Sequence, residues 1–457
     1  MKKPYILIAA ALLATGAAAQ NPSAYFMEGS TFRSQFNPAF APLRGYVNIP
    51  VLGGVQVNMA GNIALDNILY PRDGKLVTLL DSSVSAAEVL GNLKTDNLLG
   101  ADFRMNVIGF GAFTKNHKNF WSFDLNVRVN EDANLPYSLF EFIKLGKEGQ
   151  IRNFGTSMDA YLEAAFSYSF PLMDDRLYVG VRGKFLAGLA RARMIYDRFD
   201  VSLRHDRWAV STQGTIDVTA AGAEIDMPAN GDIFEIGDID INPTKPAGYG
   251  FAVDLGATYD ILPNLQASLA VNDLGFISWS KKNSISGTST QETEFTGVTV
   301  PDDGTEPAPD FDFEMLKFNP TDGKSASKML RASINAGLEY EVWRHKVGIG
   351  LLYTARFWEY KTLHNITGSV NFHPVRWFTL TGSYSVIDNR GGAVGLALNL
   401  CPSWINFFIA TDMLVSKHTP QWIPVKQSTM NVTLGLGVPI GKRSHRVPAY
   451  VREQDKR

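Results

Sequence analysis

Apolar and polar residues alternate along most of this chain. Between Trp121 and Asn130 every odd-numbered position is apolar and every even-numbered position is polar, and the pattern recurs in 253–261, 330–340, 378–386 and 430–438. A period of two residues indicates a β-strand with two different faces. The runs are about nine to eleven residues long, whereas strands average about five or six residues. A tilted strand that crosses a bilayer needs about 9–11 residues, so the pattern favours a membrane-spanning β-barrel.

In a soluble sandwich the apolar face of each strand would point to a core, whereas in a membrane barrel it points to lipid. The length and number of the runs favour the barrel, and closed single-chain bacterial barrels have an even number of strands. We therefore predict an all-β fold, a transmembrane antiparallel β-barrel of about fourteen strands. The predicted strands span 45–62, 101–113, 120–130, 159–170, 176–190, 249–261, 264–275, 329–341, 344–357, 364–373, 376–387, 391–400, 404–413 and 428–438.

The connections alternate between long and short along most of the chain. Short periplasmic turns and long outer loops are the expected asymmetry of such barrels, and this phasing puts both chain ends on the periplasmic side. The region 191–248 is expected to extend two strands above the membrane, and 84–93 and 135–145 are each expected to form a short helix. The long connections are 63–100, 131–158, 191–248 and 276–328, and the short ones are 114–119, 171–175, 262–263, 342–343, 374–375 and 401–403.

The first residues have the layout of a secretory signal peptide. Lys2 and Lys3 precede the apolar run 5–14, and small residues follow up to Ala19, after which we expect cleavage, so that the mature chain starts at Gln20. The apolar run is too short for a membrane-spanning helix, which takes roughly 20 residues, and no later segment is continuously apolar over that length. An exported chain of this kind is secreted, periplasmic or an outer-membrane barrel, and the alternation favours the cell outer membrane.

The composition argues against several other classes of protein. The formal net charge of −2 over 457 residues is unlike that of a nucleic-acid binder, and the single cysteine, Cys401, cannot form an intramolecular disulfide. No Gly-x-Ser-x-Gly elbow, Walker A loop or His-Glu-x-x-His motif occurs. We therefore expect no enzyme, no cofactor and no metal site, although residues that several strands bring together cannot be recognised from their spacing.

Two charged regions each allow a functional and a structural interpretation. Carboxylates of the acidic, proline-rich stretch 301–314 suit calcium, but a solvated loop is the simpler interpretation, and Asp238, Asp240 and Asn242 lack the other residues of a calcium loop. A basic region either attracts anions or lipopolysaccharide phosphates or balances nearby aspartates, which is the interpretation we favour. The region comprises Arg182, Lys184, Arg191, Arg193, Arg198, Arg204 and Arg207, and the aspartates are Asp174, Asp175, Asp197, Asp200 and Asp206.

The segment before the first predicted strand contains an Asn-Pro-Ala tripeptide within the stretch Phe32–Phe40. This tripeptide resembles the hatch of the FadL-type long-chain fatty acid transporters and of the PorV-like barrels of Bacteroidetes. The resemblance implies a fourteen-stranded barrel whose N-terminal segment plugs the lumen. The plug and ligand-lining candidates are Phe32, Phe36, Asn37, Pro38, Ala39 and Phe40, with Phe26 adding to the apolar lining. Asn37 and Pro38 would fix a turn, and inert plug packing is the alternative role of the whole set.

A second resemblance comes from the stretches 248–256 and 272–279, which are rich in glycine and aromatic residues. They are similar to a strand pair of an uncharacterised Bacteroidetes outer-membrane barrel family, whose members carry a domain of unknown function over nearly the whole chain. The resemblance implies a fold and a location but no substrate. We divide the chain into the signal peptide 1–19, a periplasmic or plug segment 20–44, the outer-membrane barrel 45–439 and a basic periplasmic tail 440–457.

These observations lead to one main functional hypothesis and two alternatives. The main hypothesis is a plugged barrel, embedded in outer-membrane lipid, that binds or transports a small hydrophobic molecule. The alternatives are a secretion or outer-membrane assembly accessory that contacts a protein partner through its outer loops, and a purely structural or surface barrel. A continuous apolar pocket behind the plug would favour transport, whereas a filled lumen with large ordered loops would favour the contact roles.

Overall fold

The strands that the alternation predicts are all present in the computed structural model of the chain. The structure describes residues 21–63, 69–72, 75–91, 93–203, 208–222, 242–295, 318–343, 345–388, 390–414 and 429–446. The first wall strand has two parts, β1 (Gly45–Asn48) and β2 (Val55–Gly61). The other wall strands are β5 (Asp96–Phe113), β6 (Phe120–Pro136), β8 (Phe154–Leu172), β9 (Leu177–Leu203), β11 (Gly248–Leu262), β12 (Leu265–Trp279), β16 (Ser333–Trp343), β17 (Val347–Phe357), β18 (Thr362–Val375), β19 (Phe378–Ile387), β20 (Arg390–Leu400), β21 (Asn406–Leu414) and β22 (Thr429–Ile440).

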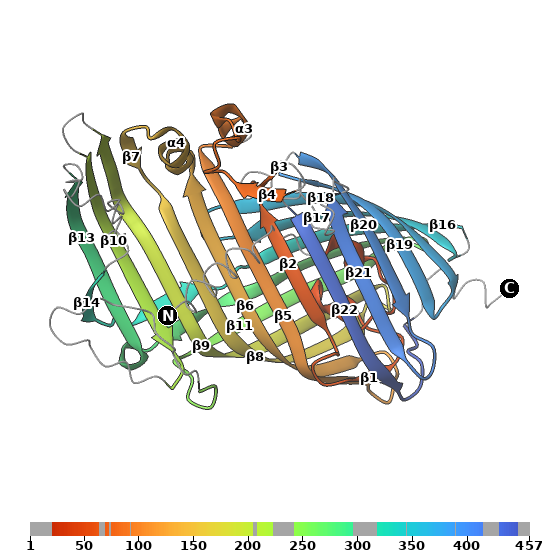
Figure 1. The fold of residues 1–457 in the computed structure, drawn as a ribbon. Coiled ribbons are helices and arrows are strands. Elements are labelled where there is room, and N and C mark those ends of the chain that lie inside the picture. Colours follow the sequence, from red (N-terminus) through yellow and green to blue (C-terminus); the bar gives the residue numbers. More distant parts are fainter. Residues whose placement is uncertain are drawn as a thin grey trace.

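Successive wall strands pair antiparallel, and the first strand closes the ring (Figure 1). β1 and β2 both pair with β22 on one side and with β5 on the other. Tyr46 lies opposite Pro439 and Gly111, and Val55 lies opposite Leu434 and Met105. The prediction of a closed antiparallel barrel of fourteen strands is therefore confirmed. Closure satisfies the backbone groups of the wall without help from water.

The two faces of the wall are inverted relative to those of a soluble protein. Along β18, Ile366, Val370 and Phe372 are exposed, whereas Thr367 and Asn371 between them are buried. β11 and β19 show the same alternation of exposed apolar positions and buried positions that are small or polar. An apolar outer face around a polar lumen is the arrangement of a membrane-spanning barrel. The alternation in the sequence thus reports a lipid-facing surface and a packed polar interior.

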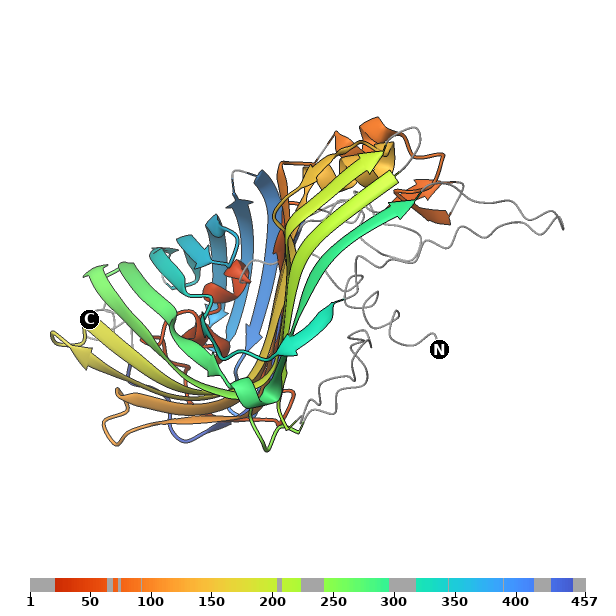
Figure 2. The same cartoon turned by 90° about the vertical axis from the view of Figure 1, so that its left-hand side faces the viewer.

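Above one side of the barrel the sheet continues into an outer platform. β9 runs on to Leu203, β10 (Trp208–Ala220) pairs back onto it, and β13 (Ser284–Phe295) pairs with β10. Figure 2 shows these strands leaning away from the barrel. The expected extension of two strands in 191–248 is therefore confirmed. The smaller strands are β3 (Leu69–Arg72), β4 (Lys75–Thr78), β7 (Gly149–Ile151), β14 (Asn319–Asp322) and β15 (Ala326–Met329).

Both predicted outer helices are also present. In α3 (Ala86–Leu90) the Ser85 side chain caps the first turn by accepting the Glu88 N–H. α4 (Tyr137–Leu145) ends at Gly146, whose φ of 61° suits a glycine. A short 3₁₀ turn, η3 (Lys281–Asn283), precedes β13. Among the described residues, no helix is long and apolar enough to cross a membrane.

The N-terminal segment enters the lumen instead of joining the wall. Residues 21–40, called the plug below, form the short helix α2 (Pro22–Tyr25), the 3₁₀ turn η1 (Phe32–Gln35) and a turn after Phe36. The side chains of Ala24, Tyr25 and Phe26 are fully buried. The predicted plug is therefore packed inside the barrel.

Candidate functional site

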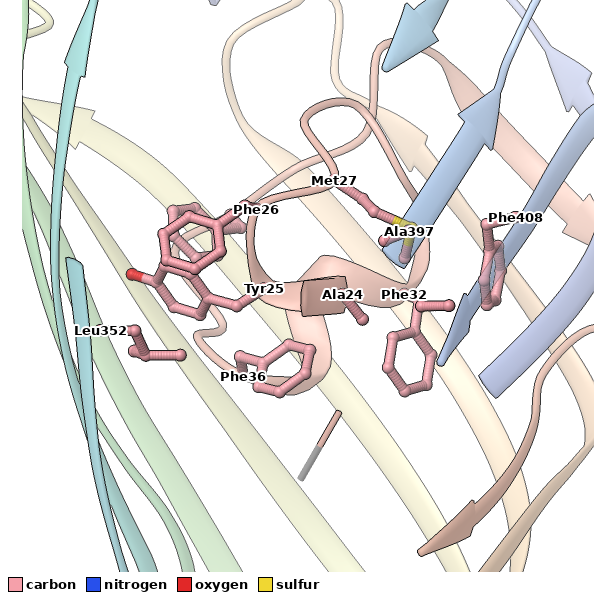
Figure 3. Packing of buried hydrophobic residues seen from close by; sticks show 11 residues of the cluster. Ala24, Tyr25, Phe26, Met27, Phe32, Phe36, Leu352, Ala397 and Phe408 are labelled. Atoms are coloured by element: carbon pink, nitrogen blue, oxygen red, sulfur yellow. The ribbon is translucent and has the colours of Figure 1, made fainter. Parts of the chain in front are cut away.

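Aromatic rings form the centre of the plug (Figure 3). Tyr25 and Phe36 meet edge to face with ring centroids 5.8 Å apart, and Phe32 lies 5.3 Å from the ring of Phe408 on β21. Aromatic pairs add about 0.5–1.5 kcal/mol to the stabilisation that comes from buried area. The rings therefore join the plug to the wall as well as to itself.

Two wall asparagines bind the plug backbone at the turn after Phe36. Asn272 and Asn335 both donate through Nδ2 to the Phe36 carbonyl, at 2.9 and 3.0 Å. The Asn37 Oδ1 accepts the Ala39 N–H at 2.9 Å, which is the side-chain-to-backbone bond of an Asx turn. The Asn-Pro-Ala tripeptide therefore forms the expected turn, and the wall holds it in place.

Charged and hydroxyl groups anchor the rest of the plug. Arg33 pairs with Glu339 of β16, and its Nε donates to the Tyr25 carbonyl at 2.6 Å. Near the start of the plug, the Ser23 hydroxyl donates to a carboxylate oxygen of Asp412 on β21 at 3.0 Å. The plug is thus fixed near its start, in its middle and at its turn.

Beside the plug, ion pairs between different strands cross the lumen. Fully buried Glu163 lies 3.0 Å from Arg104 and 2.9 Å from Arg128, and Asp273 lies 2.6 Å from Lys184. Burying ions is costly unless they are paired and hydrogen-bonded, as these are. We call the set the lumenal charge cluster. Its members are Arg104, Arg128, Arg182, Lys184, Arg331 and Arg356 with Asp102, Asp132, Glu163, Asp254 and Asp273.

A small cavity of about 40 Å³ lies where the plug meets this cluster. Phe32 and Phe36 of the plug line it together with Phe103 and Arg356 of the wall. Nη2 of Arg356 donates to Asp102 at 2.6 Å, while its buried Nε and Nη1 have no hydrogen-bond partner among the described residues. On the plug side Gln35 lies beside the two aromatic rings, and on the wall side five cationic side chains outnumber the carboxylates of Asp102 and Asp273. The cavity has room for a water molecule but not for a larger ligand.

The first wall strand is interrupted close to this part of the plug. Between β1 and β2, residues 49–54 leave the regular ladder, and Val51 adopts a φ of 68°, which is unusual for a β-branched residue. Val51 and Leu52 are 47% and 49% exposed. On the inner side, Gly53 and Phe32 line a cavity of about 20 Å³. An irregular piece of wall therefore separates the outside of the barrel from the plug.

A family model described as "Family of unknown function (DUF5723)" matches residues 38–412. The chain belongs to this family. The prediction of a family of unknown function that spans nearly the whole chain is thereby confirmed. A comparison with curated proteins finds no match for this DUF5723 protein.

Several solved structures are similar to the DUF5723 chain at low sequence identity. A TodX deltaS2S3 mutant monoaromatic hydrocarbon channel is 9% identical with a TM-score of 0.45, over 93% of this chain and 96% of that one. A Pseudomonas aeruginosa FadL homologue is 10% identical with a TM-score of 0.42, over 93% and 98%. The Ralstonia pickettii toluene transporter TbuX is 9% identical with a TM-score of 0.38, over 94% and 95%.

The structure of the DUF5723 protein brings the predicted site residues together. All of them are buried in the plug: Phe32, Phe36, Asn37, Pro38, Ala39 and Phe40. Their role in lining a ligand stays a prediction. Arg33, in the plug itself, was not predicted to anchor it. Asn272 and Asn335 were not predicted either, because an inward-facing polar residue that binds the plug follows the same alternation as any other.

The basic region is paired, but largely with partners that we did not expect. Arg182 and Lys184 lie 3.4 and 2.8 Å from Asp254, which is distant in sequence but lies on the adjacent strand. Arg198 does pair with Asp200, one of the expected aspartates. Proximity in the sequence did not predict most of these ion pairs, because neighbouring strands bring residues together that are distant in the sequence. Outside the described residues lie Arg204, Arg207, Asp238, Asp240 and 301–314.

Proposed function

We propose that this protein is an outer-membrane barrel that binds and conducts a small amphipathic molecule, an apolar group with an acidic head. One observation carries the proposal: the cavity lined by Phe32 and Phe36 is also lined by Arg356, whose Nε and Nη1 lack partners among the described residues. Aromatic rings accept an apolar chain, and a guanidinium binds a carboxylate through paired hydrogen bonds. The apolar outer face and the alternating loop lengths support the outer-membrane location.

Binding such a molecule requires the plug to move. The cavity of about 40 Å³ is much smaller than a ligand pocket, which typically measures about 300–1,000 Å³. Displacing Phe32 and Phe36 would enlarge it at the plug side, where Asn272 and Asn335 hold the backbone by hydrogen bonds. Phe32 also lines the cavity behind the irregular wall segment 49–54. The same displacement would therefore open a path from the lumen through this segment toward lipid.

The test is lipid extraction and mass spectrometry on the barrel purified from native outer membranes in mild detergent. We expect a stoichiometric acidic amphiphile that is lost in both Phe36→Ala and Arg356→Gln. Arg198→Gln is the matched control, because this arginine is exposed on the platform. A heat-dependent shift in gel mobility checks that each variant folds. The proposal fails if the folded wild type yields no ligand, or if both lumenal variants retain it.

A second candidate function is a secretion or assembly accessory that acts by protein contact. The filled lumen favours it, because the lumenal charge cluster leaves no continuous apolar pocket behind the plug in the described part of the chain. The outer platform of β9, β10 and β13 offers a surface for such a contact. We expect a protein partner to co-purify and to be lost when Arg198→Glu and Gln213→Lys are combined, since both side chains are exposed there. A partner that survives this change does not bind the platform.

A further inference from the structure

Two histidines and two glutamates meet at the mouth of the barrel where the short turns lie, the side that the sequence predicts to be periplasmic. Glu28 follows α2 in the plug, and Glu341 lies near the end of β16. His345 lies in the turn between β16 and β17, and His373 lies near the end of β18. The four side chains, called the mouth cluster, therefore join the plug to three successive wall strands.

The potential ligand atoms of the mouth cluster are close together. One carboxylate oxygen of Glu28 lies 3.4 Å from His345 Nε2 and 3.9 Å from His373 Nδ1. Glu341 Oε1 lies 3.5 Å from His345 Nδ1. One ligand atom each from Glu28, Glu341 and His373 lies within 4.8 Å of the others. The imidazole rings of His345 and His373 stack with an interplanar angle of 7° and centroids 5.4 Å apart.

One of the two carboxylates, that of Glu341, lacks a full set of polar partners within the described ranges. Two carboxylates at this separation repel each other, and the second oxygen of Glu341 is buried without a hydrogen-bond partner among the described residues. Arg376 and Arg443 line the same cavity of about 40 Å³. Arg376 attracts the Glu28 carboxylate, but in the described part of the chain neither arginine makes an ion pair with Glu341. A divalent cation would neutralise both carboxylates and give the buried oxygen a partner.

The donor atoms select the class of cation. Imidazole nitrogens and carboxylate oxygens together suit Zn²⁺ and similar first-row ions, whereas calcium and magnesium prefer oxygen alone. Zinc–nitrogen and zinc–oxygen bonds are about 2.0–2.2 Å long, so small side-chain rotations would bring the atoms of Glu28, Glu341 and His373 to bonding distance.

We propose that Glu28, Glu341 and His373, with His345 as the adjacent nitrogen donor, bind a divalent transition-metal ion of the Zn²⁺ class. The ion fastens the plug to the wall at this mouth, and the plug moves only after the ion leaves. This inference departs from the sequence expectation of no metal site. The ion site lies at a different place from the cavity beside Arg356, so ion binding does not depend on the proposed function, whereas the movement of the plug rests on it.

The test uses the full barrel in detergent, stripped with a chelator and titrated with ZnCl₂ by calorimetry. We expect one zinc ion per barrel, with elemental analysis after dialysis giving the same stoichiometry. Glu28→Gln and His373→Ala each abolish this binding. His364→Ala is the matched control, because this histidine is exposed and bonds to Tyr353 away from the cluster, and it should bind zinc like the wild type. Gel mobility before and after heating reports whether each variant folds.

A second measurement tests the effect on the plug. Hydrogen exchange of the plug amides should slow when zinc is added to the wild type, and it should not change in His373→Ala. Three results overturn the proposal: a folded wild type that binds no zinc, zinc binding that persists in both Glu28→Gln and His373→Ala, or zinc binding that leaves plug exchange unchanged. The second result would assign the ion to another group, such as His117 and His445, whose ring centroids lie 4.9 Å apart.

Discussion

At the scale of single residues, the absence of a side chain in the wall makes room for the plug. A Cβ added at Gly256 would lie 2.0 Å from Asn37 Oδ1, and a Cβ at Gly180 would lie 2.2 Å from the Pro38 carbonyl group. Real Cβ atoms do not approach other atoms so closely, and the obstacle at Gly180 is backbone. A glycine inside a strand often marks such a close approach. The two glycines therefore define where the Asn-Pro-Ala turn is seated.

Gly256→Ala should loosen the plug at this turn. The added methyl group displaces Asn37, and overpacking of this kind costs about 1–3 kcal/mol. The measurement is hydrogen exchange of the amides around Asn37, which should become faster while the barrel keeps its heat-dependent gel shift. Gly382→Ala serves as the control, because a Cβ there meets no atom within 4 Å. Equal exchange rates of these amides in Gly256→Ala and Gly382→Ala would show that the turn does not require a glycine at position 256.

At the scale of elements, the strands could be predicted because the wall faces two different media. Along β18, exposed residues that face lipid alternate with buried residues that face the lumen, so the alternation persists through the whole strand. The ends were harder to predict. β9 runs to Leu203, well beyond the predicted end at 190, because β10 pairs with its outer part and supplies the hydrogen-bond partners that extend the strand.

The partners of individual residues were not predictable in the same way. Asn272 and Asn335 bind the plug, and Glu163 binds Arg104 and Arg128, yet in the sequence all are simply polar residues at inward positions. Which of them meets which depends on strand register and barrel closure. The mouth cluster was missed for the same reason, since its members come from separate elements.

The last described residues join the C-terminal tail to the plug. Arg446 donates through Nη1 to the Ala39 carbonyl at 3.0 Å and through Nη2 to the Ser169 hydroxyl at 2.6 Å. Its guanidinium lies 4.5 Å from the centre of the Tyr178 ring. Burial lowers the pKa of Arg446 to about 10, which leaves it charged at neutral pH. The tail thus contributes one cation to a contact between plug and wall.

Arg446→Gln should release the end of the plug from the tail. Hydrogen bonds to a charged group contribute about 1.5–3 kcal/mol each, so losing them outweighs the small gain from no longer burying a charge. Limited proteolysis of the folded barrel should cut near Ala39 faster in the variant. Lys442→Gln, at an exposed position of the same tail, should behave like the wild type. Unchanged cleavage in Arg446→Gln would mean that the wall alone holds the plug.

At the scale of the whole molecule, the lumenal charge cluster braces the barrel across its interior. Arg128 of β6 lies 2.9 Å from Asp273 of β12, and Arg331, just before β16, pairs with Asp102 of β5. These strands are far apart around the ring, so the ion pairs span the lumen instead of following the wall. The polar interior is therefore part of the structural support of the barrel as well as a barrier to apolar solutes.

Glu163→Gln should lower the stability of the barrel by more than the loss of one ordinary charge would. Its side chain is fully buried and neutralises Arg104 and Arg128 at 3.0 and 2.9 Å. Glutamine keeps the size but leaves these cations facing one another, and breaking a buried pair from one side costs about 3–5 kcal/mol. The temperature at which the barrel loses its folded gel mobility should therefore fall clearly. Glu141→Gln, whose partner Lys147 is exposed, should change it little, because exposed pairs contribute about 0–1 kcal/mol. If the two variants lost their folded gel mobility at the same temperature, water and not protein would screen the lumenal charges. The interior would then have to be regarded as an open aqueous channel.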